Sequence, residues 1–187
     1  MKNIVIIGAG DLGKEVVWLI EDINKAEPTY LILGFLDDDE SKAGTEFYGY
    51  KVLGGTDQLA VLSEKMPLSA VIAIQDGKVR RKIAESHPRF NKWESIIHPS
   101  AVVASSSSIG GGSILFPHTT VSVDTYAGRF GLYYIHSTIC NDCRIGDYVT
   151  VMAGAMISER AIVGDGSHIS AGRMIEPHKM VIANSEV

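Results

Sequence analysis

Residues 132–151 read LYYIHSTICNDCRIGDYVTV, and a large apolar or aromatic side chain returns at every sixth position from Tyr133 to Val151. The same period extends over residues 97–187, where fourteen of its sixteen positions are Ile, Leu or Val. A period of six fits neither the 3.6-residue turn of an α-helix nor the two-residue alternation of an ordinary strand. The series comprises Ile97, Val103, Ile109, Leu115, Val121, Ala127, Tyr133, Ile139, Ile145, Val151, Ile157, Val163, Ile169, Ile175, Val181 and Val187.

A second series of small residues follows the first by four positions. Thirteen of its fifteen members, from Ala101 to Ser185, are no larger than valine. This pairing is typical of hexapeptide repeats, in which three hexads form one triangular coil and coils stack at the ~4.8 Å strand spacing. Residues 97–187 therefore predict a left-handed parallel β-helix of five coils. Val187 still falls in register, so we expect the natural chain to continue past this coil, because solenoids normally cap their ends.

Residues 1–92 show a different pattern. Apolar runs at 4–7, 31–36 and 70–74 predict buried strands, and apolar residues spaced by three and four after the first run predict a helix. A charged stretch at 78–86 predicts a second helix. Strands alternating with helices indicate a small parallel sheet with covering helices. The predicted chain is thus α/β plus all-β, with a Rossmann-like domain at 1–92 and a β-helix at 93–187.

Composition excludes several classes of protein. The formal net charge is -5 and no Lys/Arg run suggests a surface that follows a phosphate backbone, which argues weakly against a nucleic-acid partner. No apolar run reaches the ~18 residues of a membrane span, so we expect no membrane insertion. The apolar N-terminal run ends at glycine after a few residues, unlike a signal peptide, and two cysteines give no disulfide framework. We expect a cytoplasmic protein.

The sequence GAGDLG, residues 8–13, lies between the first predicted strand and helix. Glycines at such a junction allow a tight turn and let backbone N–H groups approach a phosphate at the helix N-terminus. Asp37 ends the next strand, where a carboxylate can bind a ribose or sugar hydroxyl. A glycine turn that only packs helix on strand is the alternative interpretation. A dehydrogenase is disfavoured because the unit is too short for a full dinucleotide fold.

Several short motifs cover essentially the whole chain: GAGDLGKEVV at 8–17, GFLDDD at 34–39, VLGG at 52–55, IAIQD at 72–76, VRRKI at 79–83 and IHPSAVV at 97–103. With them the chain resembles the NeuD-type sialic acid O-acetyltransferase family, which includes the PglD-like sugar N-acetyltransferases. The resemblance implies a homotrimer whose N-terminal domain holds a sugar or UDP-sugar. It also implies acetyl-CoA in the groove between neighbouring prisms, as donor of an acetyl group to a sugar amine or hydroxyl. No metal site is predicted.

The resemblance also implies ligand-binding residues. The nucleotide sugar would contact the glycine motif and two carboxylates after the second strand, and CoA would border small residues of the late coils. The substrate-binding candidates are Gly8, Gly10, Asp11, Leu12, Gly13, Asp37 and Asp38, and the cofactor-binding candidates are Gly154, Ala171 and Gly172. Asp11 and Leu12 stand where the family usually has a glycine and a histidine, and Gln75 replaces another glycine. Because a carboxylate repels phosphate, Asp11 weakens the expected nucleotide affinity.

The catalytic stretch of the family reads E-H-[DE]-C-x-I-G-[DE]-[FY], with the histidine as general base polarised by the next carboxylate. Residues 140–148 read CNDCRIGDY here, so Asn141 replaces the base while Asp142 keeps the carboxylate. An amide has no usable proton affinity, and losing a general base costs ~10²–10⁴-fold in rate. We therefore expect slow transfer that depends on holding the acceptor and the thioester together.

His136 is a candidate substitute base five residues before Asn141. His118 precedes it by 18 residues, one coil, so the two are expected to stack on one edge of the prism. A solvent-exposed pair without function and a metal-binding pair are the alternatives. Cys140 and Cys143 lie within the β-helix with no helix behind them, so we expect Cys143 to serve packing rather than redox chemistry.

Together these features predict an acetyl-CoA-dependent acetyltransferase that acts on a sugar or nucleotide sugar for surface glycan biosynthesis. The leading alternative is a catalytically inactive paralogue that serves as a sugar- or nucleotide-binding or scaffolding subunit. A slow acyltransferase with a different donor is a second alternative. Asn141 favours the inactive paralogue, whereas the intact acids Asp37 and Asp38 favour the enzyme.

Overall fold

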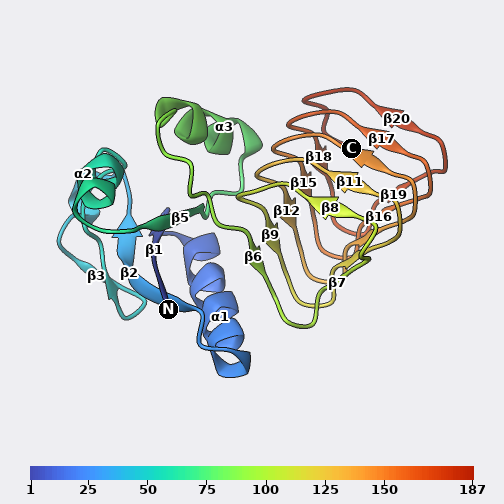
Figure 1. The fold of residues 1–187 in the computed structure, drawn as a ribbon. Helices are drawn as coiled ribbons and strands as arrows, with labels where there is room; N and C mark the ends of the chain where they lie inside the picture. Colours follow the sequence, from blue (N-terminus) through green and yellow to red (C-terminus); the bar gives the residue numbers. More distant parts are fainter.

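The computed structural model describes all 187 residues, and its N-terminal part is a small parallel sheet flanked by helices (Figure 1). The strand order is β2-β1-β5. β1 occupies the centre because both of its faces are apolar, and its residues 4–7 are all buried. The strands are β1 (Lys2–Ile7), β2 (Tyr30–Leu36) and β5 (Ser69–Ile72), and the helices are α1 (Asp11–Ala26), α2 (Gln58–Lys65) and α3 (Gly77–Ser86).

These three strands, together with α1 and α3, are the elements predicted from the sequence. α1 buries Val16, Leu19 and Ile20 because its apolar residues recur every three or four positions. The segment between β2 and β5 holds elements that were not predicted. They are the 3-10 helix η1 (Glu40–Lys42), the antiparallel pair β3 (Glu46–Phe47) and β4 (Tyr50–Lys51), and α2.

The remainder of the chain is the predicted left-handed parallel β-helix, a prism with three five-stranded faces. Each strand pairs with the strand 18 residues away, as in Ala127 with Ile145 and Ile145 with Val163. Face 1 consists of β6 (Ile96–Ile97), β9 (Ile114–Leu115), β12 (Leu132–Tyr133), β15 (Thr150–Val151) and β18 (His168–Ile169). Face 2 consists of β7 (Val102–Val103), β10 (Thr120–Val121), β13 (Thr138–Ile139), β16 (Met156–Ile157) and β19 (Met174–Ile175). Face 3 consists of β8 (Ser108–Ile109), β11 (Tyr126–Ala127), β14 (Arg144–Ile145), β17 (Ile162–Val163) and β20 (Met180–Val181).

The six-residue series fills the prism as predicted. From Leu115 to Val181 none of its members is more than 7% exposed. Ile97 is 38% exposed because it lies at the open end of the first coil. The two departures from Ile, Leu and Val occur in one coil, where Ala127 makes room for the ring of Tyr133. A Cβ atom on Gly131 would stand 2.7 Å from the Tyr133 hydroxyl, so the missing side chain accommodates the same ring.

From Ser113 to Ser167 the small-residue series is also buried, and its hydroxyls form hydrogen bonds with the backbone. Thr125 Oγ1 donates to the Cys140 carbonyl at 2.7 Å, and Ser167 Oγ donates to the Ile182 carbonyl at 3.0 Å. Cys143 is fully buried and its thiol donates to the Ser158 carbonyl at 3.1 Å. Burial raises the pKa of this thiol. These contacts agree with the packing role predicted for Cys143.

The three corners of the prism carry residues with left-handed backbone, a feature that was not predicted. Every sixth residue from Gly112 to Asn184 has φ between +55° and +79°. The first corner, between faces 1 and 2, has His118, His136, Gly154 and Gly172 at these positions. The second corner, between faces 2 and 3, has Asp124, Asp142, Arg160 and His178. The third corner, between faces 3 and 1, has Gly112, Phe130, Tyr148, Gly166 and Asn184.

Face 1 is the side of the prism that the N-terminal part covers (Figure 1). The outward side chains Ile96, Ile114 and Leu132 belong to the same core cluster as Val16 and Leu19 of α1. Outward apolar side chains on faces 2 and 3, including Val102 and Tyr126, have no such cover and remain exposed. None of the helices combines the length and the apolar character that a bilayer crossing requires.

Arg80 of α3 joins the two parts. Its side chain is buried, and its guanidinium donates to the carbonyls of Ile74, Gln75, Phe130, Tyr148 and Val149 and to the hydroxyl of Thr150, at 2.6–3.2 Å. No carboxylate pairs with it. Burial lowers the pKa of Arg80 to about 10, so the group stays charged at neutral pH. An isolated β-bridge between Trp93 and Ala70 of β5 also links the two sides of the predicted domain boundary at 92/93.

Candidate functional site

The glycine loop, residues 8–13, turns from the carboxyl end of β1 into α1. Gly8 has φ +109°, and a Cβ atom there would stand 2.7 Å from the Ala73 carbonyl oxygen. A Cβ atom on Gly13 would collide with the Gly8 carbonyl oxygen. Gly10 differs, because it caps α1 without a side-chain bond and has only open space where a Cβ would lie. No side chain therefore caps the first N–H groups of α1, which suits an anionic ligand.

Asp37 ties this loop to the second strand. Its Oδ2 accepts from the Ala9 N–H at 2.8 Å and from Lys42 Nζ at 3.0 Å, and its Oδ1 accepts from the Asp39 N–H at 2.9 Å. Burial by itself raises the pKa of Asp37, but these three hydrogen bonds outweigh it and hold the pKa below its usual value. Asp37 is therefore ionised and already engaged, and it shapes the loop. Asp38 Oδ1 accepts from the Thr56 N–H at 2.7 Å.

Asp11 and Leu12 point in different directions. The Asp11 side chain is 99% exposed and pairs with Lys14 at 2.9 Å. The hydrogen bond from Lys14 lowers the pKa of Asp11. Lys14 thus offsets part of the charge that was expected to repel a phosphate. Leu12 is buried in the core, so only its backbone can face a ligand.

The first corner begins where face 1 packs against the N-terminal part. Tyr134 and Ile135 pack against the core cluster that contains Leu12. In the following coil Gln75 Nε2 lies 3.7 Å from Met152 Sδ. Gln75 follows Ala73 and Ile74, which stand against Gly8, so this contact lies at the end of the sheet where the glycine loop turns. Two residues past Tyr134 and Met152, the chain reaches His136 and Gly154 at the exposed edge of the corner.

The exposed edge of the first corner is a straight column of one residue per coil. The rings of His118 and His136 stack with centroids 4.9 Å apart and an interplanar angle of 12°. Gly154 and Gly172 continue the column, and no atom lies within 4 Å of the position of a Cβ on either. Ala171 is exposed beside them. The stacking of the two histidines is confirmed, and the two glycines leave the next part of the edge without projecting side chains.

Asn141 and Asp142 lie at the second corner, away from the N-terminal part. Asn141 Nδ2 donates to Asp142 Oδ2 at 2.8 Å, and Arg160 Nε lies 3.7 Å from the same oxygen. His136 and Asn141 flank opposite ends of β13, so one chain does not bring them together. The six-residue register by itself places His136 and Asn141 at different corners, so their separation could have been predicted from the sequence. No group of three or more His, Cys, Asp or Glu side chains is arranged to hold a metal ion.

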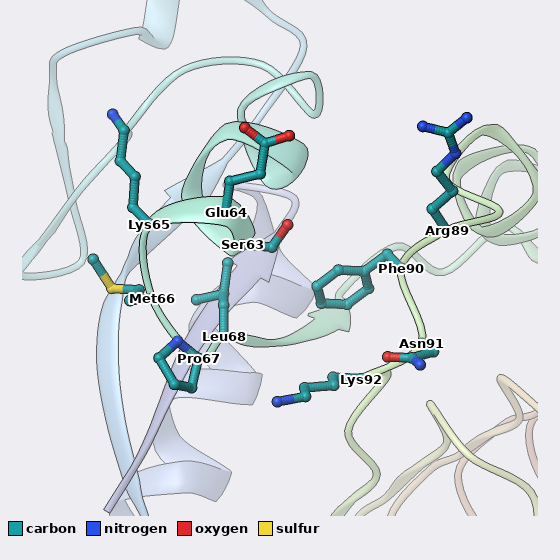
Figure 2. A pocket seen from close by; sticks show the side chains of 10 residues that line it. All are labelled: Ser63, Glu64, Lys65, Met66, Pro67, Leu68, Arg89, Phe90, Asn91 and Lys92. Carbon is teal, nitrogen blue, oxygen red and sulfur yellow. The ribbon is translucent and has the colours of Figure 1, made fainter.

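A cavity of about 530 Å³ lies elsewhere, between the end of α2 and the segment that precedes Trp93 (Figure 2). Met66, Pro67 and Leu68 line it just before β5 begins, at the sheet edge opposite the glycine loop. Figure 2 shows the ring of Phe90 turned inward, whereas the ends of Lys65 and Arg89 extend away. None of the predicted site residues borders this cavity. The candidate site is therefore the open surface around the glycine loop and the first corner.

The N-terminal part matches a known family. Residues 3–87 fit the model of the PglD N-terminal domain. These residues are similar to a PglD N-terminal domain. This match covers the glycine loop, Asp37, Asp38 and Arg80, but not the β-helix.

The similarity to known proteins extends beyond the N-terminal part, and for the solved structures it covers nearly the whole chain. UDP-N-acetylbacillosamine N-acetyltransferase of Bacillus subtilis is 29% identical over 118 residues, 62% of this chain and 51% of that protein, so the match spans about half of this curated relative. The acetyltransferase domain of PglB from Neisseria gonorrhoeae, solved with acetyl coenzyme A, is 26% identical with a TM-score of 0.87, over 99% of this chain and 87% of that chain. A histidine-to-asparagine variant of perosamine N-acetyltransferase from Caulobacter crescentus, solved with CoA and GDP-perosamine, shares the fold at 24% identity and a TM-score of 0.79, over 100% and 89% of the two chains. The predicted resemblance to PglD-like sugar acetyltransferases is confirmed.

Proposed function

We propose that this protein is an acetyltransferase that moves the acetyl group of acetyl-CoA to an amine of a nucleotide sugar. The observation that carries the proposal is the contact of Gln75 with Met152, which joins the end of the sheet that holds the glycine loop to the start of the first corner. The loop supplies a region for an anionic ligand, and the corner supplies an edge free of projecting side chains at Gly154 and Gly172. The full-length likeness to a domain solved with acetyl-CoA supports the donor, and the name of the Bacillus subtilis relative supports a nucleotide-sugar acceptor.

Each part of the site has a separate task in this proposal. The free N–H groups at the start of α1 bind the phosphates, and Asp37 holds the loop in the shape that presents them. The glycine column at the first corner lets the extended CoA chain lie close to the backbone, because no side chain projects at Gly154 or Gly172. Holding the amine against the thioester supplies much of the rate, since effective molarities of oriented groups are large.

Three copies of the chain complete the site in this proposal. The Asn141 corner of one chain lies across the prism from its own glycine loop, so only a neighbouring chain can present that corner to the first corner. The exposed outward side chains of faces 2 and 3, such as Val102, Tyr126 and Met180, give that neighbour an apolar surface to cover. Sedimentation at micromolar concentration is expected to give three times the 20.2 kDa chain mass. A monomer would contradict the shared site.

Calorimetry tests the two ligand sites without requiring turnover. Acetyl-CoA and a panel of UDP- and GDP-linked amino sugars are titrated into the parent protein and into Asp37→Ala. We expect Asp37→Ala to weaken nucleotide-sugar binding by at least ~10-fold, because the Ala9 N–H and Lys42 lose their shared acceptor, about the value of one charged hydrogen bond. Binding of acetyl-CoA is expected to stay unchanged. Glu46→Ala, on the exposed hairpin, serves as a control. Equal loss of both ligands would indicate misfolding, and loss of neither would remove Asp37 from the site.

Asn141 favours one other function, a paralogue that binds the same ligands without transferring the acetyl group. In that case the parent protein binds both ligands but shows no turnover with any acceptor. Asn141→His would place an imidazole beside Asp142, whose Oδ2 already accepts from the residue at 141. Turnover that appears only in this variant would establish the paralogue. Turnover in the parent protein would exclude it.

A further inference from the structure

We propose that His136 is the general base of the transfer, in place of the histidine that Asn141 replaces. This inference rests on the proposed function. Its starting point is the column at the first corner, where the exposed His136 stands directly above Gly154 and Gly172. It is thus the imidazole that adjoins the groove proposed for CoA, and it follows by two residues the Tyr134 that packs on the glycine-loop side.

The backbone fixes the position of this imidazole. His136 has φ +59°, and its N–H donates to the Pro117 carbonyl at 3.2 Å. The ring of His118 stacks on it from the previous coil. No side-chain hydrogen bond occupies either ring nitrogen of His136. A base held in place with free ring nitrogens can accept a proton from a bound acceptor.

Two other histidines are engaged in structural contacts. Nδ1 of His98 lies 2.8 Å from Ser100 Oγ and its Nε2 lies 3.4 Å from Asp22. Both ring nitrogens of His87 bond to backbone carbonyls. His178 lies at the second corner, and His168 lies outward on face 1 near the start of α3. His118 shares the column but lies one coil further from the glycines, which makes it the matched control.

The proposed step needs no reactant other than the acceptor amine and acetyl-CoA. The acceptor nitrogen attacks the thioester carbonyl carbon, a C–N bond forms and the C–S bond breaks. The proton that leaves the nitrogen passes to the imidazole of His136, and the imidazolium then returns it to the CoA thiolate. The products are the amide and free CoA. An imidazole suits this role because its ordinary pKa lies near neutral pH.

The test is His136→Gly combined with chemical rescue. Glycine fits the site, since Gly154 and Gly172 occupy the same column with φ +66°. We expect kcat to fall at least ~100-fold, within the range of a lost general base, while affinities for acetyl-CoA and nucleotide sugar stay within ~3-fold. Free imidazole added to the reaction is expected to restore at least ~10-fold of the lost rate. His118→Gly, the matched control in the same column, is expected to keep kcat within ~5-fold.

Each outcome decides between the inference and the proposed function. Absence of turnover in the parent protein would overturn both. Turnover that survives His136→Gly would overturn only the role of His136. A loss of rate that imidazole does not restore would also overturn it, because a positioning or structural role gives no rescue. An equal loss in His118→Gly would assign the effect to the stacked pair and overturn the single base.

Discussion

Arg80→Leu is expected to destabilise the protein by roughly 3–5 kcal/mol, because hydrogen bonds to a charged group contribute about 1.5–3 kcal/mol each and several are lost together. The guanidinium donates to five backbone carbonyls and one hydroxyl that come from both parts of the chain. Leucine fills part of the volume but leaves the carbonyls of Ile74, Phe130 and Tyr148 without this donor. Urea unfolding followed by circular dichroism measures the loss. Faster proteolysis between α3 and β6 is expected to accompany it, because the N-terminal part is no longer attached at the third corner.

Arg81→Leu is the matched control on the next residue. Arg81 is partly exposed, lies 4.9 Å over the Tyr148 ring and pairs with Asp165 at 3.6 Å. Such a surface contact contributes about 1 kcal/mol or less. Equal effects of the two substitutions would show that Arg80 does not join the parts.

Ile145→Asp is expected to abolish folding of the β-helix or to lower its stability by about 5 kcal/mol. Ile145 is fully buried between Ala127 and Val163 inside the prism. Removing a buried Ile side chain costs about 2–5 kcal/mol, and an unpaired carboxyl in a dry interior adds several more. A domain stabilised by about 5–15 kcal/mol has little margin for such a loss. Soluble yield and the thermal unfolding midpoint report the result.

Arg144→Asp tests the same change on the opposite side of the same strand. Arg144 points outward and is exposed, although its guanidinium donates to the Asp124 carbonyl at 3.0 Å. We expect the thermal unfolding midpoint of Arg144→Asp to fall by a few degrees at most, since one exposed contact contributes about 1 kcal/mol. If Ile145→Asp behaved like Arg144→Asp, the inward register would be wrong.

The interior of the β-helix could be predicted because every coil repeats the same local geometry. A residue such as Ile145 faces inward for the same reason as Val163, and the period alone reveals it. The corners carry a weaker signal. Ten of the thirteen left-handed positions are Gly, His, Asp or Asn, the residues that adopt this backbone most readily. Phe130, Tyr148 and Arg160 interrupt the pattern, so it does not stand out in the sequence.

The contacts of the candidate site depend on distant residues, and local sequence could not predict them. Arg80 is one charge among several in a charged helix, yet four of its six acceptors lie 50 to 70 residues away in the sequence. Asp37 was expected to offer its oxygens to a sugar, but Ala9 and Lys42 donate to its Oδ2 and the Asp39 N–H donates to its Oδ1. Ala9 follows the neighbouring strand, and Lys42 belongs to the 3-10 helix that was not predicted. The roles assigned to the ligand-binding candidates stay predictions until binding is measured.

The left-handed backbone at the corners accepts side chains of very different chemistry. At the first corner the same backbone, near φ +60°, carries imidazole in two coils and hydrogen in the next two. At the second corner it carries carboxylate, guanidinium and imidazole, and at the third it carries phenyl and phenol. A single codon change at such a position can alter the functional group shown to solvent while the coil keeps its course. The functional groups along an edge of this scaffold can therefore be exchanged at the corners while the coils keep their fold.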